Sequence, residues 1–272
     1  IVQSRWVTST IYRMKILVTN DDGFDNPGIW ALVRAVNSLG EVTVVAPADN
    51  QSGVGTALSL RKSVKIKQTA SQVDGVDCYA VSGTPADSVI LGLEHVLQGG
   101  ADIVLSGINP GFNTGRNVFI SGTMGAAIQA SGKGVKACAF SLGMDGDLED
   151  AKMGDVANAI AVELLSSYTP RGSLFNINFP AESGDTYKGV EGAFPQPTEF
   201  MTKLETHRDG GYEIFSGLRI NILQEELIPG SDIEVLNRGC IAISALDGPT
   251  LAHNSEDSTL QRMVEAAKRV IG

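Results

Sequence analysis

Two adjacent carboxylates, Asp21 and Asp22, stand directly after a short apolar run at residues 16–19. Such a run is typical of a strand that is buried on both faces, and Pro27 behind it indicates the start of a helix. Two anions side by side repel each other unless a cation, a proton or water compensates them, and Mg²⁺ does this with few carboxylates. The pair therefore predicts a metal site, with a solvated turn that caps a helix as the alternative.

Two further loops carry oxygen-bearing side chains and follow predicted strands. The strand at residues 41–46 leads into a loop with Ser52, and the strand at residues 102–106 leads into a loop with Asn109 and Asn113. Loops that follow parallel strands emerge at one edge of an open sheet, so we expect these side chains beside the paired carboxylates. Carboxylate, hydroxyl and amide oxygens are ligands for Mg²⁺, Mn²⁺ or Ca²⁺ rather than for structural zinc.

The glycine-dense loop at residues 106–127 runs into the start of a predicted helix. Ser121, Gly122 and Thr123 stand there. A helix N-terminus with such residues offers N–H groups to a phosphate, although an ordinary capped helix is the alternative. A metal beside a phosphate site indicates hydrolysis of a phosphate ester. The metal would polarise a phosphoryl oxygen and lower the pKa of water, while N–H groups and hydroxyls would stabilise the growing charge.

The composition is that of an ordinary globular protein, with 43% hydrophobic and 19% charged residues over 272 residues. A net charge of -10 argues against polymeric nucleic acid as a partner. The three cysteines are far apart and form no CxxC motif, so we expect no structural zinc and a cytoplasmic protein. No apolar stretch reaches the roughly 20 residues of a transmembrane helix, and we expect no membrane partner.

Strand and helix signals alternate through the first two thirds of the chain. This alternation predicts an α/β fold with a doubly wound, Rossmann-like, mostly parallel sheet and helices on both faces. Frequent turns over 181–230 predict a protruding hairpin or arm, and 231–272 is expected to add a C-terminal strand and helix. We therefore predict a single domain over 14–272 with its core at 14–180, preceded by an N-terminal extension at 1–13.

The individual elements are predicted from hydrophobic periodicity and from helix caps. The predicted strands are 16–19, 41–46, 102–106, 135–142, 174–179, 233–235 and 240–243, with shorter strands between 57 and 81. The predicted helices are 27–39, 124–130, 150–166 and 259–270, together with one that begins at Thr84 and is ended by Gly99.

Four segments stand in a distinctive order along the chain: ILVTNDDG with PGI, VVAPADNQSG, SGTPADSV, and SGINPGFNTG with SGTMGAA. Together they resemble the SurE family of survival proteins, which are metal-dependent 5'/3'-nucleotidases. No single segment is decisive, but their order and spacing make a chance similarity very unlikely. The resemblance is strong over 14–180 and looser over the remainder.

The resemblance implies a divalent-metal-dependent phosphatase with a Rossmann-like core. It implies nucleoside 5'- and 3'-monophosphates and short polyphosphate as substrates, and a homodimer or homotetramer with exchanged C-terminal elements. One divalent cation, such as Mg²⁺ or Mn²⁺, would be bound by Asp21, Asp22, Ser52 and Asn109, and the two aspartates would be catalytic. The segments implied to line the phosphate and substrate site contain Asn20, Gly53, Asn113, Ser121, Gly122 and Thr123.

One position departs from the family pattern. Many members carry a His after the Ser-Gly of the second loop, where this chain has Thr56. The implied metal ligands are intact, but a role for that His in substrate contact or proton transfer has no counterpart here. The base that activates water is therefore open between Asp22 and a hydroxide on the metal.

Two other kinds of protein share part of this pattern. Receiver domains of signalling proteins also bind Mg²⁺ through paired acidic residues after a first strand, but they need a further Asp after a later strand, where this chain reads SGIN. A nucleotide-binding module without turnover would typically show G-x-G-x-x-G after the first strand, which this chain lacks. The sequence therefore favours the hydrolase, with these two as its alternatives.

Overall fold

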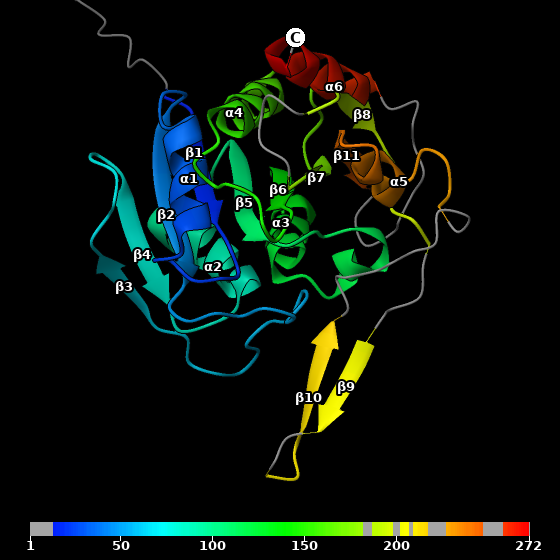
Figure 1. The fold of residues 1–272 in the computed structure, drawn as a ribbon. Helices are drawn as coiled ribbons and strands as arrows, with labels where there is room; N and C mark the ends of the chain where they lie inside the picture. The colour runs from blue at the N-terminus through cyan, green and yellow to red at the C-terminus, as the bar shows by residue number, and fades with distance from the viewer. Residues whose placement is uncertain are drawn as a thin grey trace, which may run out of the picture.

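The computed structural model describes residues 13–181, 187–197, 202–206, 209–216, 227–246 and 258–271. Within these ranges the chain forms a nine-stranded sheet with helices on both faces (Figure 1). In sheet order the strands are β3 (Ile66–Thr69), β4 (Asp77–Val81), β2 (Glu41–Pro47), β1 (Lys15–Thr19), β5 (Ile103–Pro110), β6 (Lys136–Leu142), β7 (Leu174–Phe179), β11 (Ile241–Leu246) and β8 (Val190–Gly192). The α-helices are α1 (Pro27–Val36), α2 (Pro85–Leu91), α3 (Gly122–Gly132), α4 (Ala151–Leu165), α5 (Asp232–Asn237) and α6 (Ser258–Ile271).

The strand order makes this sheet doubly wound. β1 pairs in parallel with β2 on one side and with β5 on the other, and β5, β6 and β7 continue in parallel. Only β3 and β11 introduce antiparallel pairing into the described part of this sheet. The chain winds outward from β1 in both directions, which confirms the predicted fold class. A topological switch point therefore lies between β1 and β5, where open α/β sheets bind ligands.

Apolar side chains pack on both faces of the sheet, as the continuous hydrophobic runs of the central strands predict. In β1, Ile16 and Val18 belong to the core under α1, α4 and α6, whereas Leu17 belongs to the core under α2 and α3. All three side chains are fully buried. Successive residues of a strand point to opposite faces, so one short apolar run anchors both helix layers.

Two helices begin where their capping residues predict. The Asn26 side chain accepts a hydrogen bond from Gly28 N at the start of α1. Thr84 and Asp87 form a reciprocal capping box at the start of α2, which π-helix η1 (Gly92–Val96) continues. Each of these helices has proline at its first position, where the missing N–H is not needed. Residue types therefore set these boundaries locally, and α1 ends at Val36 rather than at residue 39.

The predicted strand at residues 233–235 is wrong, because these residues lie in helix α5. The side chain of Ser231 accepts a hydrogen bond from Glu234 N and caps this helix. Two apolar residues that flank Glu234 are too few to distinguish a strand from a short buried helix. The overlooked signal was the pattern Ser-x-x-Glu, which marks a helix N-terminus.

The segment at 181–230 divides between the main sheet and a hairpin. β9 (Thr202–Thr206) and β10 (Tyr212–Ser216) pair in antiparallel fashion and project away from the sheet, as Figure 1 shows. β8, in contrast, pairs in parallel with β11 inside the main sheet. The hairpin lies within the range for which an arm is predicted, and β8 extends the core beyond residue 180. Residues 1–12 of the predicted extension lie outside the described residues.

Candidate active site

The two carboxylates after β1 have different surroundings. Asp21 is only 3% exposed, and its Oδ1 accepts a hydrogen bond of 2.6 Å from the hydroxyl of Thr123 in the first turn of α3. Asp22 is less enclosed, and its Oδ1 lies 3.4 Å from Asn50 Nδ2. Its other oxygen, Oδ2, is buried and accepts no hydrogen bond from any residue that the structure describes. A buried carboxylate oxygen without a partner is unfavourable, so this atom calls for a ligand.

The electrostatics of the pair lead to the same expectation. Burial raises the pKa of Asp21, although the hydrogen bond from Thr123 opposes this shift. Burial, followed by the charge of the neighbouring Asp21, raises the pKa of Asp22 to about 7. Both effects disfavour two negative charges at this point. A divalent cation beside the pair would reverse them, because it stabilises the ionised form of each carboxyl group.

The loop that carries Ser52 is attached to both neighbouring elements through its backbone. Gln51 N donates to the carbonyl of Asp21 at 2.7 Å, and Gly55 N donates to the carbonyl of Ile120 at 2.9 Å. Gly125 of α3 permits this approach, because a Cβ at this position would lie 2.0 Å from the carbonyl oxygen of Gly55. The absence of a side chain at Gly125 therefore allows the Ser52 loop to lie beside the carboxylates.

An irregularity in β5 positions Asn109. The register with β6 shifts between Ser106 and Asn109. Gly107 lies there with φ +132°, and a Cβ would be 2.4 Å from the carbonyl oxygen of Phe140. Asn109 Nδ2 donates to the carbonyl of Gly111 at 2.7 Å. This bond uses the NH₂ end of the side-chain amide. The carbonyl oxygen Oδ1 at the other end is therefore available for a ligand.

Seven of the ten predicted site residues line one small cavity of about 170 Å³ at the carboxyl edge of the sheet. These are Asp21, Asp22, Ser52, Gly53, Asn109, Asn113 and Ser121. Sequence reasoning missed four further residues of this wall, namely Pro110, Phe112, Asn117 and Ile120. All four lie in the glycine-dense loop whose composition indicated a binding function, so the loop was identified but its individual contacts were not.

The other three predicted residues lie behind the wall. Asn20 closes its own turn, because its side chain donates to the carbonyl of Gly23 at 2.8 Å and accepts from Gly23 N at 3.2 Å. Gly122 and Thr123 are buried beneath Asp21, and the hydroxyl of Thr123 is used by that carboxylate. The start of α3 therefore positions Asp21, while Ser121 reaches the cavity itself.

A buried polar network fixes Asn113. Asn113 N donates to Asn178 Oδ1 at 2.9 Å, and Asn113 Nδ2 donates to Ser141 Oγ at 2.8 Å. The carbonyl of Asn113 accepts from Asn176 Nδ2 at 2.7 Å. Both asparagines of β7 are fully buried, although they alternate with apolar residues as solvent-facing side chains would. Only their position beside the loop identifies them as supports of the site.

The side chains at this edge fit a hard divalent cation. Four predicted ligands supply only oxygen atoms, which suits Mg²⁺ or Mn²⁺. Across the described ranges, no group of three or more His, Cys, Asp or Glu side chains is arranged to hold a metal. A cation here would therefore need the hydroxyl of Ser52 and the amide oxygen of Asn109 besides the two carboxylates. The partnerless Oδ2 of Asp22 is the observation that fits such a cation best.

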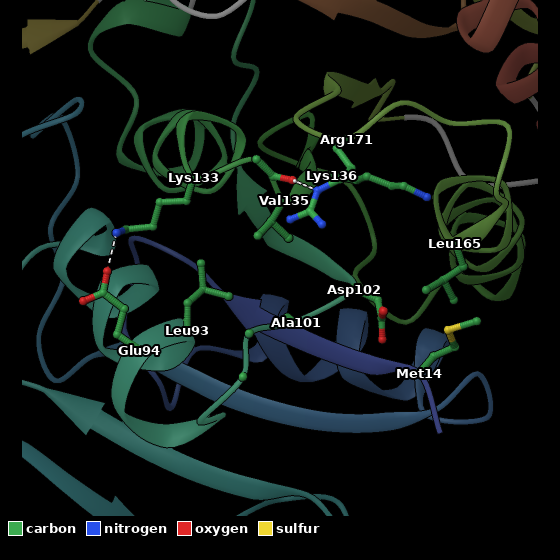
Figure 2. A pocket seen from close by; sticks show the side chains of 13 residues that line it. Met14, Leu93, Glu94, Ala101, Asp102, Lys133, Val135, Lys136, Leu165 and Arg171 are labelled. Carbon is green, nitrogen blue, oxygen red and sulfur yellow. Dashed lines mark hydrogen bonds and ion pairs between the residues drawn. The ribbon is translucent and has the colours of Figure 1, made fainter. Parts of the chain in front are cut away.

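A larger cavity of about 650 Å³ lies at the opposite edge of the sheet, around the amino ends of β1, β5 and β6 (Figure 2). Its cationic groups already have protein partners. Lys133 forms an ion pair with Glu94, and Lys136 Nζ donates to carbonyl groups at the end of α4. Arg171 Nε donates to the carbonyl of Gly134. These cationic side chains bind other parts of the protein rather than serve as anion ligands in the cavity. We therefore place the candidate active site at the carboxyl edge.

The sheet topology and the cavity at its switch point define an α/β protein with a ligand site at the carboxyl ends of β1 and β5. Residues 16–203 match the family model described as survival protein SurE, and the chain belongs to this family. This confirms the resemblance inferred from the sequence.

Individual relatives match most of the chain. It is 37% identical over 239 residues to the 5'-nucleotidase SurE of Dehalococcoides mccartyi strain CBDB1, covering 86% of this chain and 88% of the relative. It is 38% identical over 246 residues to the 5'-nucleotidase SurE of Methanopyrus kandleri, and the match covers 86% of this chain and 91% of the relative. The crystal structure of the SurE protein from Aquifex aeolicus superposes with a TM-score of 0.71 at 28% identity, covering 92% of this chain and 99% of that one.

Proposed function

We propose that the protein is a divalent-cation-dependent phosphatase that hydrolyses nucleoside 5'-monophosphates to nucleoside and phosphate. The proposal extends to 3'-monophosphates and short polyphosphate. The observation that carries it is the buried, partnerless Oδ2 of Asp22 beside Asp21, in a cavity shared with the oxygen-bearing side chains of Ser52 and Asn109. Membership of a family whose relatives are named 5'-nucleotidases supports the substrate class.

The cation would be held by Asp21, Asp22, Ser52 and Asn109. When bound, it would act as a Lewis acid toward the phosphoryl oxygen and would lower the pKa of water. Thr123 keeps the carboxylate of Asp21 in one orientation through its 2.6 Å hydrogen bond.

The protein's own groups would handle the substrate and the proton. Asp22 is one candidate to accept the proton of the attacking water, because it lines the cavity and its Oδ2 has no hydrogen-bond partner among the described residues. The alternative is that the cation alone lowers the pKa of the water enough for it to lose its proton without a protein base. Ser121 and Asn113 face the same cavity and would orient the phosphate. Their fixed hydrogen bonds mean that little reorganisation is needed as charge grows on the phosphoryl oxygens.

The size of the cavity limits what it encloses. Pockets that bury a whole drug-sized ligand are roughly 300–1,000 Å³, whereas this one is about 170 Å³. We therefore propose that it holds the phosphate end of the substrate and that the nucleoside extends outside. Hydrolysis of AMP, GMP, CMP and UMP with specificity constants within about tenfold of one another is expected, because the base contributes few contacts.

Several broader expectations complete the proposal. The three cysteines are buried and free, which suits a reducing cytoplasm. No described helix is long and apolar enough to cross a membrane. Assembly as a homodimer or homotetramer, and a single domain over 14–272 with an arm at 181–230, also belong to the proposal. Light scattering of the purified protein tests the assembly.

Incubation of the protein with AMP and Mn²⁺, with and without EDTA, tests the activity. Release of inorganic phosphate that EDTA abolishes supports the phosphatase. Labelling of the protein by acetyl phosphate would instead indicate a receiver-type signalling module. Binding of AMP without release of phosphate would indicate a nucleotide-binding module, and either of these two results would overturn the proposal.

A further inference from the structure

Asp232 is a buried carboxylate that lies outside the candidate cavity and takes no part in the proposed chemistry. It is the first residue of α5 and is 0% exposed. Its oxygens accept hydrogen bonds from the backbone N–H groups of Gly115 at 2.7 Å, Gln196 at 3.0 Å and Ile233 at 2.8 Å. Among the described residues no ion pair includes it. The side chain thus joins three separate segments of the chain.

A carboxylate in this position needs an explanation, because burial of an unpaired charge is unfavourable. Desolvation raises the pKa of Asp232 to about 6, although the three backbone N–H groups oppose the shift. Only a carboxylate offers two acceptor oxygens without an N–H group of its own. Oδ2 holds Gly115, while Oδ1 holds Gln196 and Ile233. An asparagine in this place could accept hydrogen bonds only through its amide oxygen. Its NH₂ group would face a backbone N–H group, which is also a donor.

Gly115 is the point at which this contact reaches the cavity. It is the first residue of the 3-10 helix η2 (Gly115–Phe119), and it lies two positions after Asn113. Within and after η2, the carbonyl of Asn117 accepts from Ile120 N and Ser121 N, and all three of these residues line the cavity. On the other side, Asn113 is held by the network of β6 and β7. Asp232 therefore fastens the start of the segment whose end forms the wall.

We propose that Asp232 is a positioning residue that couples the short helix α5 to the cavity wall at residues 113–121, and that this contact sets how tightly the phosphate end of the substrate is bound. The inference rests on the proposed function for its substrate. Asp232 does not contact the cavity, so its effect passes through Gly115. Its loss should weaken substrate binding while the cation ligands remain in place.

Asp232→Asn is the test variant. Its amide oxygen can keep the two bonds to Gln196 and Ile233, while its NH₂ group faces Gly115 N–H and cannot accept. The substitution thus removes the bond to the loop and spares the others. Glu234→Gln is the matched control, because it removes one negative charge from the same helix. Glu234 forms an ion pair with Arg238 and accepts a hydrogen bond from Gly230 N, and no described hydrogen bond joins its side chain to residues 113–121.

The variants are compared by steady-state kinetics with AMP and Mn²⁺, by Mn²⁺ titration and by hydrogen exchange. For Asp232→Asn we expect the KM to rise at least about tenfold, with kcat and Mn²⁺ affinity within about threefold of wild type. Amides at residues 113–121 should exchange at least about tenfold faster. Glu234→Gln should match wild type in all three. A purely structural role would instead change exchange throughout the molecule and leave the KM alone.

Wild-type KM and wild-type exchange at residues 113–121 in folded Asp232→Asn would overturn the inference. If wild type releases no phosphate from AMP, the proposed function fails, and exchange alone decides whether Asp232 holds the loop. If Asp232→Asn does not fold, the Gly115 amide of wild type is measured instead. Protection comparable to that of the β-strand amides supports the inference, and exchange at the rate of a free amide overturns it.

Discussion

At the scale of single residues, the two neighbouring aspartates are chemically unlike. Asp21 is held by Thr123, whereas Asp22 keeps one buried oxygen without a partner in the described part of the chain. Proteins rarely leave a buried polar atom unpartnered unless a ligand or water satisfies it. In the proposed function, the first carboxylate is therefore the more fixed of the two and the second is the one with an oxygen open to a ligand.

Asp22→Asn should abolish turnover and stabilise the metal-free protein. Specificity constants should fall at least about a hundredfold, because a ligand charge and a candidate base are lost together. In EDTA at pH 7.5 the free energy of unfolding should rise by on the order of 2 kcal/mol, since the repulsion and desolvation that raise the pKa of Asp22 to about 7 disappear. Kinetics and denaturant titration check both effects. Retained activity with normal cation dependence would contradict the assignment.

Asp232 predicts a pH dependence of stability. Its pKa is raised from 3.8 to about 6 in the folded protein, so the folded state binds more protons than the unfolded state between these values. The stabilisation by this group is therefore complete below pH 4 and is lost as pH rises to 6. Denaturant titrations of wild type and Asp232→Asn should show wild type losing about 3 kcal/mol relative to the variant over this interval. A difference that does not change with pH would contradict this.

At the scale of elements, the cavity depends on how closely α3 approaches the loop with Ser52. Gly125 and Gly55 are in backbone contact, and no side chain fits between them. The same helix is capped by Ser121, which lines the cavity, and supplies Thr123 to Asp21. One helix therefore positions both a carboxylate and the hydroxyl loop, so its packing and the activity should vary together.

Gly125→Ala should lower activity by displacing the Ser52 loop. Its Cβ would lie 2.0 Å from the carbonyl oxygen of Gly55, and such overpacking typically costs about 1–3 kcal/mol. Gly132→Ala in the same helix is the control, because a Cβ there meets nothing within 4 Å. It should stabilise the protein by up to about 1 kcal/mol and leave kinetics unchanged. Thermal unfolding and AMP hydrolysis of the two variants separate packing from helix propensity.

At the scale of the whole molecule, the chain beyond residue 180 completes the core. β11 and β8 extend the sheet, and α6 packs on both strands and against α4. Ile16 at the start of the chain and Met263 near its end belong to the same hydrophobic core. Since the site lies at an edge of this shared core, binding at the site should stabilise the whole fold.

Cation binding should therefore appear as increased thermal stability. At about 100 times the dissociation constant, free Mn²⁺ should raise the free energy of unfolding by about 2.7 kcal/mol and the Tm by roughly 5–10 °C. Differential scanning fluorimetry with and without EDTA measures this shift. Asp22→Asn should lose most of it, and Glu234→Gln should keep it. An equal shift in Asp22→Asn would indicate that the cation binds elsewhere.

The sequence by itself determined the alternation of strands and helices, the capped starts at Pro27 and Pro85, and the convergence of three loops at one sheet edge. The first two features are local, because strand periodicity and capping act over a few residues. The third follows because loops after parallel strands emerge at the same edge of a sheet. The prediction of a strand at 233–235 is wrong because Ile233 and Val235 alone carry too little periodicity to indicate helix α5.

Only the tertiary structure decided which polar groups support the cavity. Thr123 and Asp21 are 102 positions apart, Asn178 and Asn113 are 65 apart, and Asp232 and Gly115 are 117 apart. Hydrogen bonds between such distant residues leave no periodic trace in the sequence. They form where the packing of α3, β7 and α5 brings isolated polar side chains against other segments of the chain. The glycines and asparagines of the loop at 106–127 indicated a binding function, but they did not indicate which distant residues hold the loop in place.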